Sequence, residues 1–270
     1  MLAGRTAIVT GGAQGIGGAT VAALLANGAN VCVADLDAGR SQEIVANWGA
    51  DRVLAISGDL SDPDLPERIF AGTVETFGAV DILVNNAGFF WDAPVHRMTD
   101  DQFAAMLDIH AMVPFRMVRA AVRRWRPLAK DELARGETRH RKIVNISSRA
   151  ALTGLAGAAN YAAGKAALLG LTRSVARENA KLAINVNAVA FGGVDTRFQE
   201  SVREGNVVVS GGREVPLGRP ATVDGAEPRK VRPRSMNGRN ATPDEAAAAV
   251  LVLCSPSSDL INGEVLEVNA

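Results

Sequence analysis

The sequence predicts an α/β protein built on one doubly wound parallel sheet with helices on both faces. Three observations support this prediction. Short apolar segments of strand length alternate with helix-like segments along the chain, as in parallel sheets joined by crossover helices. The first apolar segment runs directly into a glycine-rich loop, and several later ones end at polar residues. Because ligands of such sheets bind beyond the carboxyl ends of the strands, the same pattern predicts where a functional site lies.

The first strand, loop and helix form one unit. A strand is expected at Thr6–Thr10 and a helix at Ala19–Ala26, with the loop Gly11–Gly17 between them. This order aims backbone N–H groups and a helix N-terminus at a pyrophosphate. The next strand, Asn30–Ala34, ends at Asp35. A carboxylate there can accept hydrogen bonds from an adenosine ribose and would repel a 2′-phosphate; in the alternative interpretation, Asp35 only starts a turn.

The alternation continues to the end of the chain. Further strands are expected at Arg52–Ser57, Asp81–Val84, Lys142–Ile146, Ala183–Val189 and Glu264–Val268. Further helices are expected after Ser61–Pro63, from a capping box at Thr99–Gln102 to about Arg124, at Ala162–Arg177 and at Pro243–Cys254. The polar or glycine residues that follow strands are Asp35, Asp59, Asn85–Gly88 and Ser148. We therefore expect these residues to gather at one edge of the sheet.

Two segments stand apart from this pattern within an expected single domain of residues 1–270. The charged segment Leu128–Arg141 predicts a surface loop. Residues 197–240 are irregular and glycine-rich, which is typical of a functional flap on the substrate side. Within them, Val207–Val215 could form a small hairpin. The basic run Arg229–Arg234 is either a solvated loop or a receptor for the phosphate of a coenzyme A or carrier-protein thioester.

Tyr161, the only tyrosine, lies one helical turn before Lys165, and Ser148 ends an apolar segment upstream. Positions i and i+4 share a helix face, which brings the ammonium over the phenol. Lowering a phenol pKa from about 10 to about 7 needs roughly 4 kcal/mol. One cation at about 4 Å supplies on the order of 4 kcal/mol at an effective dielectric near 20. With the Ser148 hydroxyl holding a substrate oxygen, this is a general acid/base site for alcohol–ketone chemistry. In the alternative, Lys165 only covers an apolar face with its methylene groups.

Three groups of residues stand in the order and at the spacing of a known family: Thr10–Gly17, Asn85–Gly88, and Ser148 with Tyr161 and Lys165. On these residues the chain resembles the short-chain dehydrogenase/reductase family over nearly its whole length, and most of all its 3-oxoacyl-reductase and hydroxyacyl-dehydrogenase branch. The resemblance implies a Rossmann fold, a homotetramer and an NAD-dependent oxidoreductase. It also implies that Tyr161 is the acid/base, that Lys165 lowers its pKa and binds the nicotinamide ribose, and that Ser148 orients the substrate carbonyl.

A set of cofactor contacts is implied in the same way. The implied cofactor-binding residues are Gly11, Gln14, Gly15, Ile16, Gly17, Asp35, Asp59, Leu60, Asn86, Ala87, Gly88, Tyr161, Lys165, Gly192, Val194 and Thr196. Among them, Asp59 and Leu60 would flank the adenine. A carboxylate at Asp35 with an uncharged Gln14 implies a preference for NAD over NADP.

Two residues depart from the family pattern. His110 stands where the family usually has a catalytic Asn. It is either a packed histidine satisfied by a backbone carbonyl or a substitute member of the proton relay. Phe191 replaces the usual proline before Gly192, which removes a restraint on φ at the nicotinamide end. Directly after Asn85–Gly88, the segment Phe89–Trp91 is either part of the core or of an oligomer contact, or an apolar wall for the substrate.

The bulk composition excludes several functions. Lys and Arg together number 29, as do Asp and Glu, so no charge excess points to nucleic acid or to a membrane surface. We expect no metal, because no His, Cys or Asp residues have ligand spacing. Two cysteines in apolar segments, Cys32 and Cys254, are expected to be reduced core residues, which suits the cytoplasm. No apolar run is long enough to span a bilayer, and the start of the chain does not resemble a signal peptide.

The predicted function is hydride transfer between NAD(H) and a secondary alcohol or ketone, with a 3-oxoacyl or 3-hydroxyacyl thioester as one candidate substrate. The rival is a cofactor-binding sensor or scaffold whose catalysis has decayed, suggested by His110 and Phe191. The intact Ser148, Tyr161 and Lys165 favour the enzyme.

Overall fold

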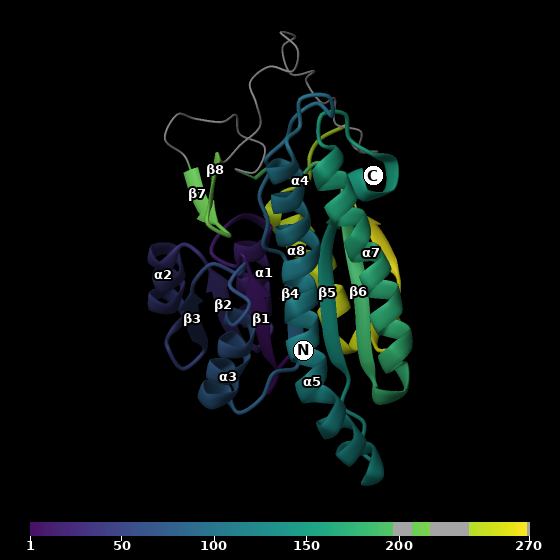
Figure 1. Cartoon of the computed structure of the whole chain (residues 1–270). Coiled ribbons are helices and arrows are strands. Elements are labelled where there is room, and N and C mark those ends of the chain that lie inside the picture. Colours follow the sequence, from purple (N-terminus) through teal and green to yellow (C-terminus); the bar gives the residue numbers. More distant parts are fainter. Residues whose placement is uncertain (197–206, 217–237, 269–270) are drawn as a thin grey trace.

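The computed structural model of the chain describes residues 1–196, 207–216 and 238–268. Within them, seven parallel strands form one sheet (Figure 1), in the spatial order β3 (Val53–Ser57), β2 (Asn30–Asp35), β1 (Thr6–Thr10), β4 (Ile82–Asn85), β5 (Arg141–Ser148), β6 (Ile184–Phe191) and β9 (Val265–Val268). The chain winds outward from β1 in both directions, which creates the switch point where such sheets bind ligands. The predicted doubly wound parallel sheet is confirmed.

Helices cover both faces of this sheet (Figure 1). They are α1 (Gly15–Ala26), α2 (Ala38–Trp48), α3 (Leu65–Phe77), α4 (Asp100–Leu107), η1 (Asp108–Met112), α5 (Val113–Ala134), α6 (Ala150–Thr153), α7 (Ala159–Asn179), η2 (Ala180–Leu182), α8 (Pro243–Cys254) and η4 (Pro256–Ser258). Successive strand residues point to opposite faces. In β1, Ile8 packs with residues of α3, α5 and α7, whereas Ala7 and Val9 pack with residues of α1, α2 and α8. Both predicted core cysteines are buried and free.

The prediction of a surface loop at Leu128–Arg141 is wrong for much of that segment. Helix α5 continues into it, and Arg141 already belongs to β5. The apolar face of α5 continues through buried Trp125 and Ala129, which keeps the helix packed on the sheet. Near its end, Glu132 accepts hydrogen bonds of 2.8 and 2.7 Å from both terminal nitrogens of Arg141. This bidentate pair joins the end of α5 to the start of β5.

The small hairpin expected within residues 197–240 is present as the antiparallel pair β7 (Val207–Ser210) and β8 (Arg213–Pro216). Apart from residues 238–240, the rest of this segment, including the basic run Arg229–Arg234, lies outside the described residues. None of the helices in the described part of the chain is both long and apolar enough to cross a membrane.

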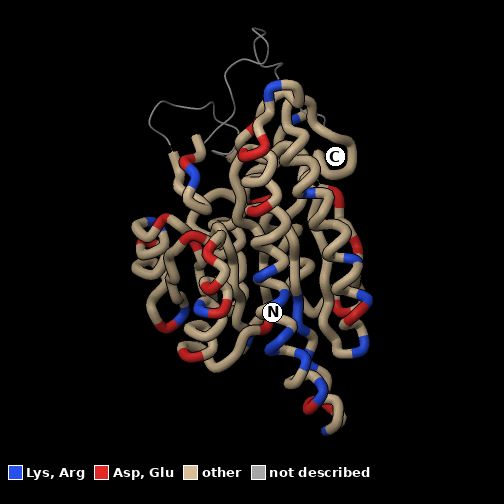
Figure 2. The backbone as a smooth tube through the Cα atoms, in the orientation of Figure 1, with Lys and Arg blue, Asp and Glu red and all other residues tan. Residues whose placement is uncertain are grey.

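Basic residues gather at the amino ends of the strands and along the lower part of α5 (Figure 2). There, buried Asp81 accepts hydrogen bonds from Arg5 (3.0 Å), Arg139 (2.5 Å) and the backbone N–H of Thr6 (3.0 Å). Burial raises the pKa of Asp81, but these partners outweigh it, so its pKa lies below the usual value. The carboxylate therefore stays ionised and ties β1, β4 and the approach to β5 together.

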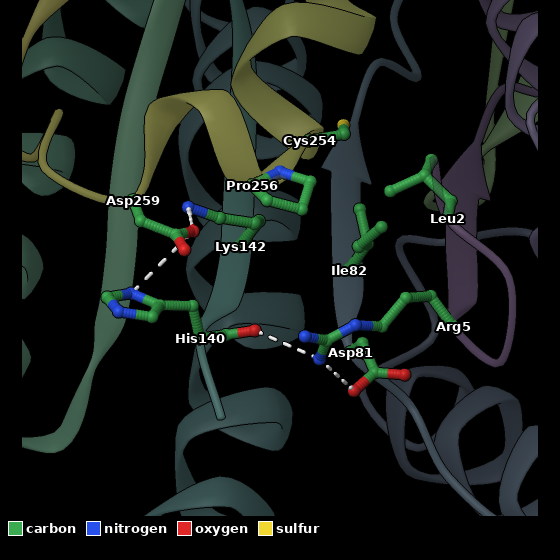
Figure 3. Close-up of a pocket in the computed structure, with 9 residues that line it drawn as sticks. All are labelled: Leu2, Arg5, Asp81, Ile82, His140, Lys142, Cys254, Pro256 and Asp259. Carbon is green, nitrogen blue, oxygen red and sulfur yellow. Dashed lines mark hydrogen bonds and ion pairs between the residues drawn. The ribbon is translucent and has the colours of Figure 1, made fainter. Parts of the chain in front are cut away.

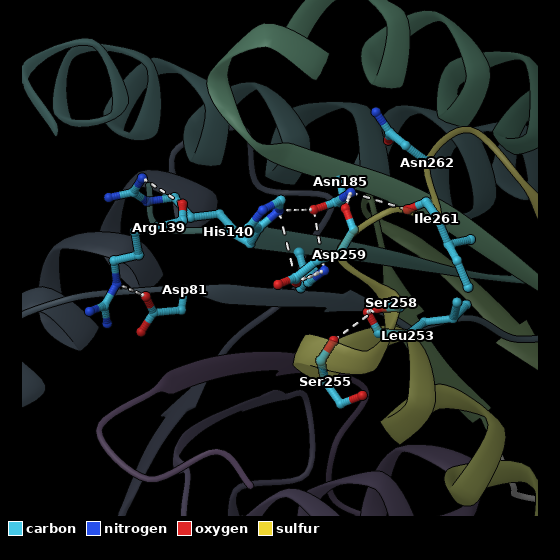
Figure 4. A network of polar contacts seen from close by, with 12 residues as sticks. Asp81, Arg139, His140, Asn185, Leu253, Ser255, Ser258, Asp259, Ile261 and Asn262 are labelled. Carbon is cyan, nitrogen blue, oxygen red and sulfur yellow. Dashed lines mark hydrogen bonds and ion pairs between the residues drawn. The ribbon is translucent and has the colours of Figure 1, made fainter. Parts of the chain in front are cut away.

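A second polar group lies beside the first, at the start of β5 and β6 (Figures 3 and 4). The Lys142 ammonium lies 2.6 Å from Asp259 and 3.2 Å from the side-chain oxygen of Asn185, which His140 also contacts at 2.9 Å. Burial lowers the pKa of Lys142, and the Asp259 carboxylate opposes that effect. The cavity between the two groups has a volume of only about 10 Å³, which is at the lower limit for one water molecule. We regard this edge of the sheet as structural.

Candidate active site

The glycine-rich loop is locked against the end of β4. The side-chain amide of Asn86 donates to the carbonyls of Thr10 (3.0 Å) and Gly11 (2.8 Å), and the Thr10 hydroxyl accepts from the backbone N–H groups of Asn86 (3.0 Å) and Ala87 (3.1 Å). Gly11 has φ +61°, and a Cβ on Gly17 would lie 1.9 Å from the Gly11 carbonyl oxygen. Glycine is therefore required sterically at Gly17 and conformationally at Gly11.

The first turn of α1 fits a pyrophosphate. Its N-cap residue, Gln14, makes no side-chain hydrogen bond to that turn, so the backbone N–H groups there are not satisfied by a capping side chain. The Gln14 amide oxygen accepts from Arg40 instead. At the end of β2, the Asp35 carboxylate accepts from the backbone N–H groups of Ala13 (2.9 Å) and Asp37 (3.0 Å). These bonds fix its position beside the glycine loop.

The residues implied for the nicotinamide end follow β6. Gly192 extends the sheet through a hydrogen bond from its N–H to Val268 (2.9 Å), and buried Val194 pairs with Ala241. A Cβ on Gly15 would lie 3.6 Å from Thr196 Cγ2. The segment after β6 thus reaches the glycine loop. Phe191 is a buried residue of the core on the α1 and α8 face.

Tyr161 lies near the start of α7 and is 7% exposed. Its ring stacks obliquely on Phe90, with centroids 4.3 Å apart, and meets the His110 ring edge-on at 5.0 Å. The Lys165 ammonium lies 5.9 Å from the Tyr161 ring centroid. The predicted pair therefore shares one helix face inside the protein, enclosed by an aromatic ring and an imidazole.

Lys165 is held in place by the backbone of β5. Its ammonium donates to the carbonyl of Ile146 (2.7 Å), and its own carbonyl accepts from the Ser147 hydroxyl (3.0 Å). Complete burial lowers the pKa of Lys165 to about 7, because the charged form loses its hydration. Both the protonated and the neutral form of Lys165 are therefore populated at neutral pH.

Ser148 ends β5 on the same side. Its hydroxyl oxygen accepts from the backbone N–H of Ala150 (3.1 Å), and Ala150 belongs to the apolar cluster that contains Tyr161 and Phe90. The sheet end and the start of α7 therefore bring Ser148, Tyr161 and Lys165 into one region.

His110 lies in η1, a single π-helical turn between α4 and α5 that the sequence did not predict. Its Nε2 lies 2.9 Å from the carbonyl oxygen of Phe89, while its Nδ1 is buried without a partner among the described residues. A Cβ on Gly88 would lie 2.4 Å from the ring, and one on Gly164 would lie 2.9 Å from the His110 Cβ. Burial and the Lys165 ammonium hold the pKa of His110 well below its usual value, although the Phe89 carbonyl opposes them. The imidazole is neutral at neutral pH, and both glycines are needed to make room for it.

Sequence reasoning missed Asn160 and the buried partners of Asn85. Asn160, fully buried at the start of α7, donates to the carbonyls of Trp91 (3.0 Å) and Gln102 (3.2 Å) and accepts from the Tyr161 N–H (2.8 Å). Under the site, Asn85 donates to Asn145, which donates to Thr172, at 2.8 and 2.9 Å. Asparagines in otherwise apolar strands and at the start of an apolar helix were the available signal, since buried amides need partners.

Residues 5–207 match the family model described as short chain dehydrogenase. Galactitol 2-dehydrogenase from Agrobacterium fabrum is 33% identical over 265 residues, 98% of this chain and 96% of that protein. A short chain dehydrogenase from Burkholderia cenocepacia in complex with NADP has a TM-score of 0.79 and 32% identity, covering 99% of this chain and 97% of the other. A 3-ketoacyl-(acyl-carrier-protein) reductase from Brucella melitensis complexed with NADH has a TM-score of 0.81 and 25% identity, covering 99% and 98%.

The chain belongs to the short chain dehydrogenase family. It is an oxidoreductase that moves a hydride between a nicotinamide cofactor and a hydroxyl or keto group. The predicted family, fold and enzyme class are confirmed.

Proposed function

We propose that the enzyme interconverts a secondary alcohol and a ketone with NAD(H), and that Tyr161 moves the proton. The observation that carries this proposal is the enclosure of the only tyrosine between Phe90 and His110, with the Lys165 ammonium 5.9 Å from its ring centroid. A phenol in such a setting can exchange a proton with a substrate oxygen if the cation stabilises the phenolate.

Each side chain has a task in this mechanism. A nicotinamide held by these residues would supply or accept the hydride. Tyr161 donates its hydroxyl proton to the carbonyl oxygen during reduction. During oxidation its phenolate accepts the proton of the substrate hydroxyl. Lys165 stabilises the phenolate and binds the nicotinamide ribose. The Ser148 oxygen already accepts from Ala150, so its hydroxyl hydrogen serves to hold the substrate oxygen beside Tyr161.

His110 is proposed as a member of the proton relay. A carbonyl oxygen can only accept, so the contact with Phe89 assigns the imidazole proton to Nε2. Nδ1 is then a buried acceptor on a neutral ring that meets the Tyr161 ring edge-on. The packed alternative accounts for Nε2 but leaves Nδ1 without a role. His110→Asn should keep a large part of the turnover and His110→Phe should lose it; equal rates in the two variants contradict the relay.

The cofactor contacts remain those implied by the family. The proposed cofactor-binding residues are Gly11, Gln14, Gly15, Ile16, Gly17, Asp35, Asp59, Leu60, Asn86, Ala87, Gly88, Tyr161, Lys165, Gly192, Val194 and Thr196. We propose NAD rather than NADP, because a 2′-phosphate beside the Asp35 carboxylate would be repelled. Steady-state rates with NADH and NADPH test this, and a clear preference for NADPH would overturn the Asp35 assignment.

The proposed substrate is apolar or an acyl thioester. Phe90 forms an apolar wall against Tyr161, with centroids 4.3 Å apart, and the Brucella melitensis relative is a 3-ketoacyl-(acyl-carrier-protein) reductase. The galactitol dehydrogenase relative makes a sugar alcohol the competing class. Turnover should be measured on acetoacetyl-CoA, a steroid alcohol and galactitol, and activity confined to galactitol rules out the thioester.

Tyr161→Phe tests the chemistry directly. The hydroxyl is lost while the ring keeps its contacts with Phe90 and His110, so turnover should fall by about 10²–10⁴-fold with NADH binding retained. A variant that keeps wild-type turnover removes Tyr161 from the reaction.

We propose further that residues 1–270 form a single domain, that the enzyme is a homotetramer in the cytoplasm, and that its partners are small molecules rather than nucleic acid or membranes. The equal numbers of acidic and basic residues support the last point. Light scattering at several protein concentrations tests the tetramer.

A further inference from the structure

The tip of the β7–β8 hairpin lies on the carboxylate of Asp59. The Ser210 hydroxyl donates to Asp59 Oδ1 at 3.1 Å, and the backbone N–H of Gly211 donates to Asp59 Oδ2 at 2.8 Å. The same Gly211 N–H also lies 2.8 Å from the Ser61 hydroxyl oxygen, and the Ser61 N–H donates to Asp59 at 2.9 Å. Residues about 150 positions apart in the sequence therefore share one carboxylate.

The hairpin is held at two more points. Val215 of β8 is fully buried in the same apolar cluster as Leu60 and Phe89. On the other side, Arg213 lies 3.7 Å from Asp101 at the start of α4. Figure 1 shows the hairpin above the carboxyl ends of β2 and β3. It is thus fixed to the apolar core, to the end of β3 and to the segment after β4.

These contacts have a chemical consequence at Asp59. A carboxylate that accepts several hydrogen bonds favours its ionised form. Burial raises the pKa of Asp59, but the bonds from Ser61, Gly211 and Ser210 outweigh it and bring the pKa below its usual value. They also fix the direction in which the two oxygens point. An ionised, oriented carboxylate is a good acceptor for an exocyclic amino group such as that of adenine.

We propose that Ser210 and Gly211 are positioning residues of the adenine subsite, and that the β7–β8 hairpin orients Asp59 to receive the adenine amino group. This inference rests on the proposed role of Asp59 in cofactor binding. It assigns to a segment between β6 and α8, on the proposed substrate side of the chain, a part in binding the opposite end of the cofactor.

Three ligands separate this role from a general effect on the fold. NADH and ADP-ribose both carry the adenine, whereas reduced nicotinamide mononucleotide lacks it. In Ser210→Ala, and more strongly in the Ser61→Ala/Ser210→Ala double variant, the dissociation constants of NADH and ADP-ribose should rise about 3- to 10-fold, because hydrogen bonds to the carboxylate are lost. The affinity for the mononucleotide should not change. Val209→Thr, an exposed position on the same hairpin, serves as the control and should bind all three ligands like the wild type.

The outcomes distinguish the two levels of the proposal. Asp59→Ala should weaken NADH and ADP-ribose binding but not that of the mononucleotide. If it does not, the adenine role of Asp59 fails and the inference with it. If Asp59→Ala weakens the binding of NADH and ADP-ribose but the double variant binds both like the wild type, only the role of the hairpin is overturned. Equal weakening of all three ligands in the double variant also overturns it, because that result indicates a disturbed fold.

Discussion

Replacing Lys165 by methionine should remove a pH dependence of stability that this one residue imposes. Burial lowers the lysine pKa from 10.5 to about 7. Between these values the unfolded chain binds a proton at this lysine that the folded chain does not. The free energy of unfolding therefore rises with pH in this window, by about 1.4 kcal/mol per pH unit. From about pH 7 to about pH 8.5 the rise amounts to about 2 kcal/mol.

Urea unfolding followed by tryptophan fluorescence, at fixed protein concentration and without cofactor, measures this dependence. The window ends near pH 9, where the unfolded cysteines lose protons that Cys32 and Cys254 retain in the fold, since burial raises their pKa to about 12. Lys165→Met should flatten the curve by about 2 kcal/mol relative to the wild type. The exposed Lys181→Met is the control and should parallel the wild type. Parallel curves for Lys165→Met and the wild type would refute the argument that burial controls this lysine.

Three further outcomes follow from the packing. Gly17→Ala should abolish cofactor binding and destabilise the fold, because its Cβ would lie 1.9 Å from the Gly11 carbonyl oxygen. The control is Gly18→Ala, whose Cβ would lie 3.6 Å from its nearest neighbour and which should bind NADH normally. Calorimetric titration with NADH compares the affinities of the two variants. Asp81→Asn should lower the free energy of unfolding by about 2 kcal/mol at neutral pH, since it weakens the hydrogen bonds from Arg5, Arg139 and the Thr6 N–H, and the deficit should shrink as pH falls below about 4 towards the lower pKa of Asp81 in the fold. Because the pKa of His110 lies well below 6.5, wild-type stability should fall by about 1.4 kcal/mol per pH unit below about pH 6.5, and His110→Asn should lack that fall.

The sequence predicted the sheet well because its central strands are buried on both faces. Segments such as Thr6–Thr10 read as continuous apolar runs, and the structure has this strand with the expected bounds. Prediction was weaker where tertiary contacts decide. The end of α5 carries the charged run Lys130–Glu132, which is typical of a surface loop, yet the pairing of Glu132 with Arg141 and the burial of Trp125 keep it helical.

The π-helical turn at His110 shows a second limit. The sequence predicts a continuous helix there, because no residue in Asp108–Met112 breaks a helix. At this turn the His110 ring packs against Gly88 and its Cβ against Gly164, two glycines that come from elsewhere in the chain. Such turns are often found at functional sites. Likewise, the contact between Gly211 and Asp59 joins residues 152 positions apart, and no local sequence pattern predicts it.

The surroundings of Tyr161 and Lys165 also change how the charge of this pair is interpreted. The sequence argument treated Lys165 as a fixed cation that makes Tyr161 more acidic. Burial, however, lowers the pKa of Lys165 itself to about 7, so the ammonium is only partly present at neutral pH without a counter-charge. A phenolate at Tyr161 would supply that charge, and each ionised group then stabilises the other. The ammonium of Lys165 is therefore present in only part of the molecules at neutral pH, and a phenolate at Tyr161 would raise that fraction.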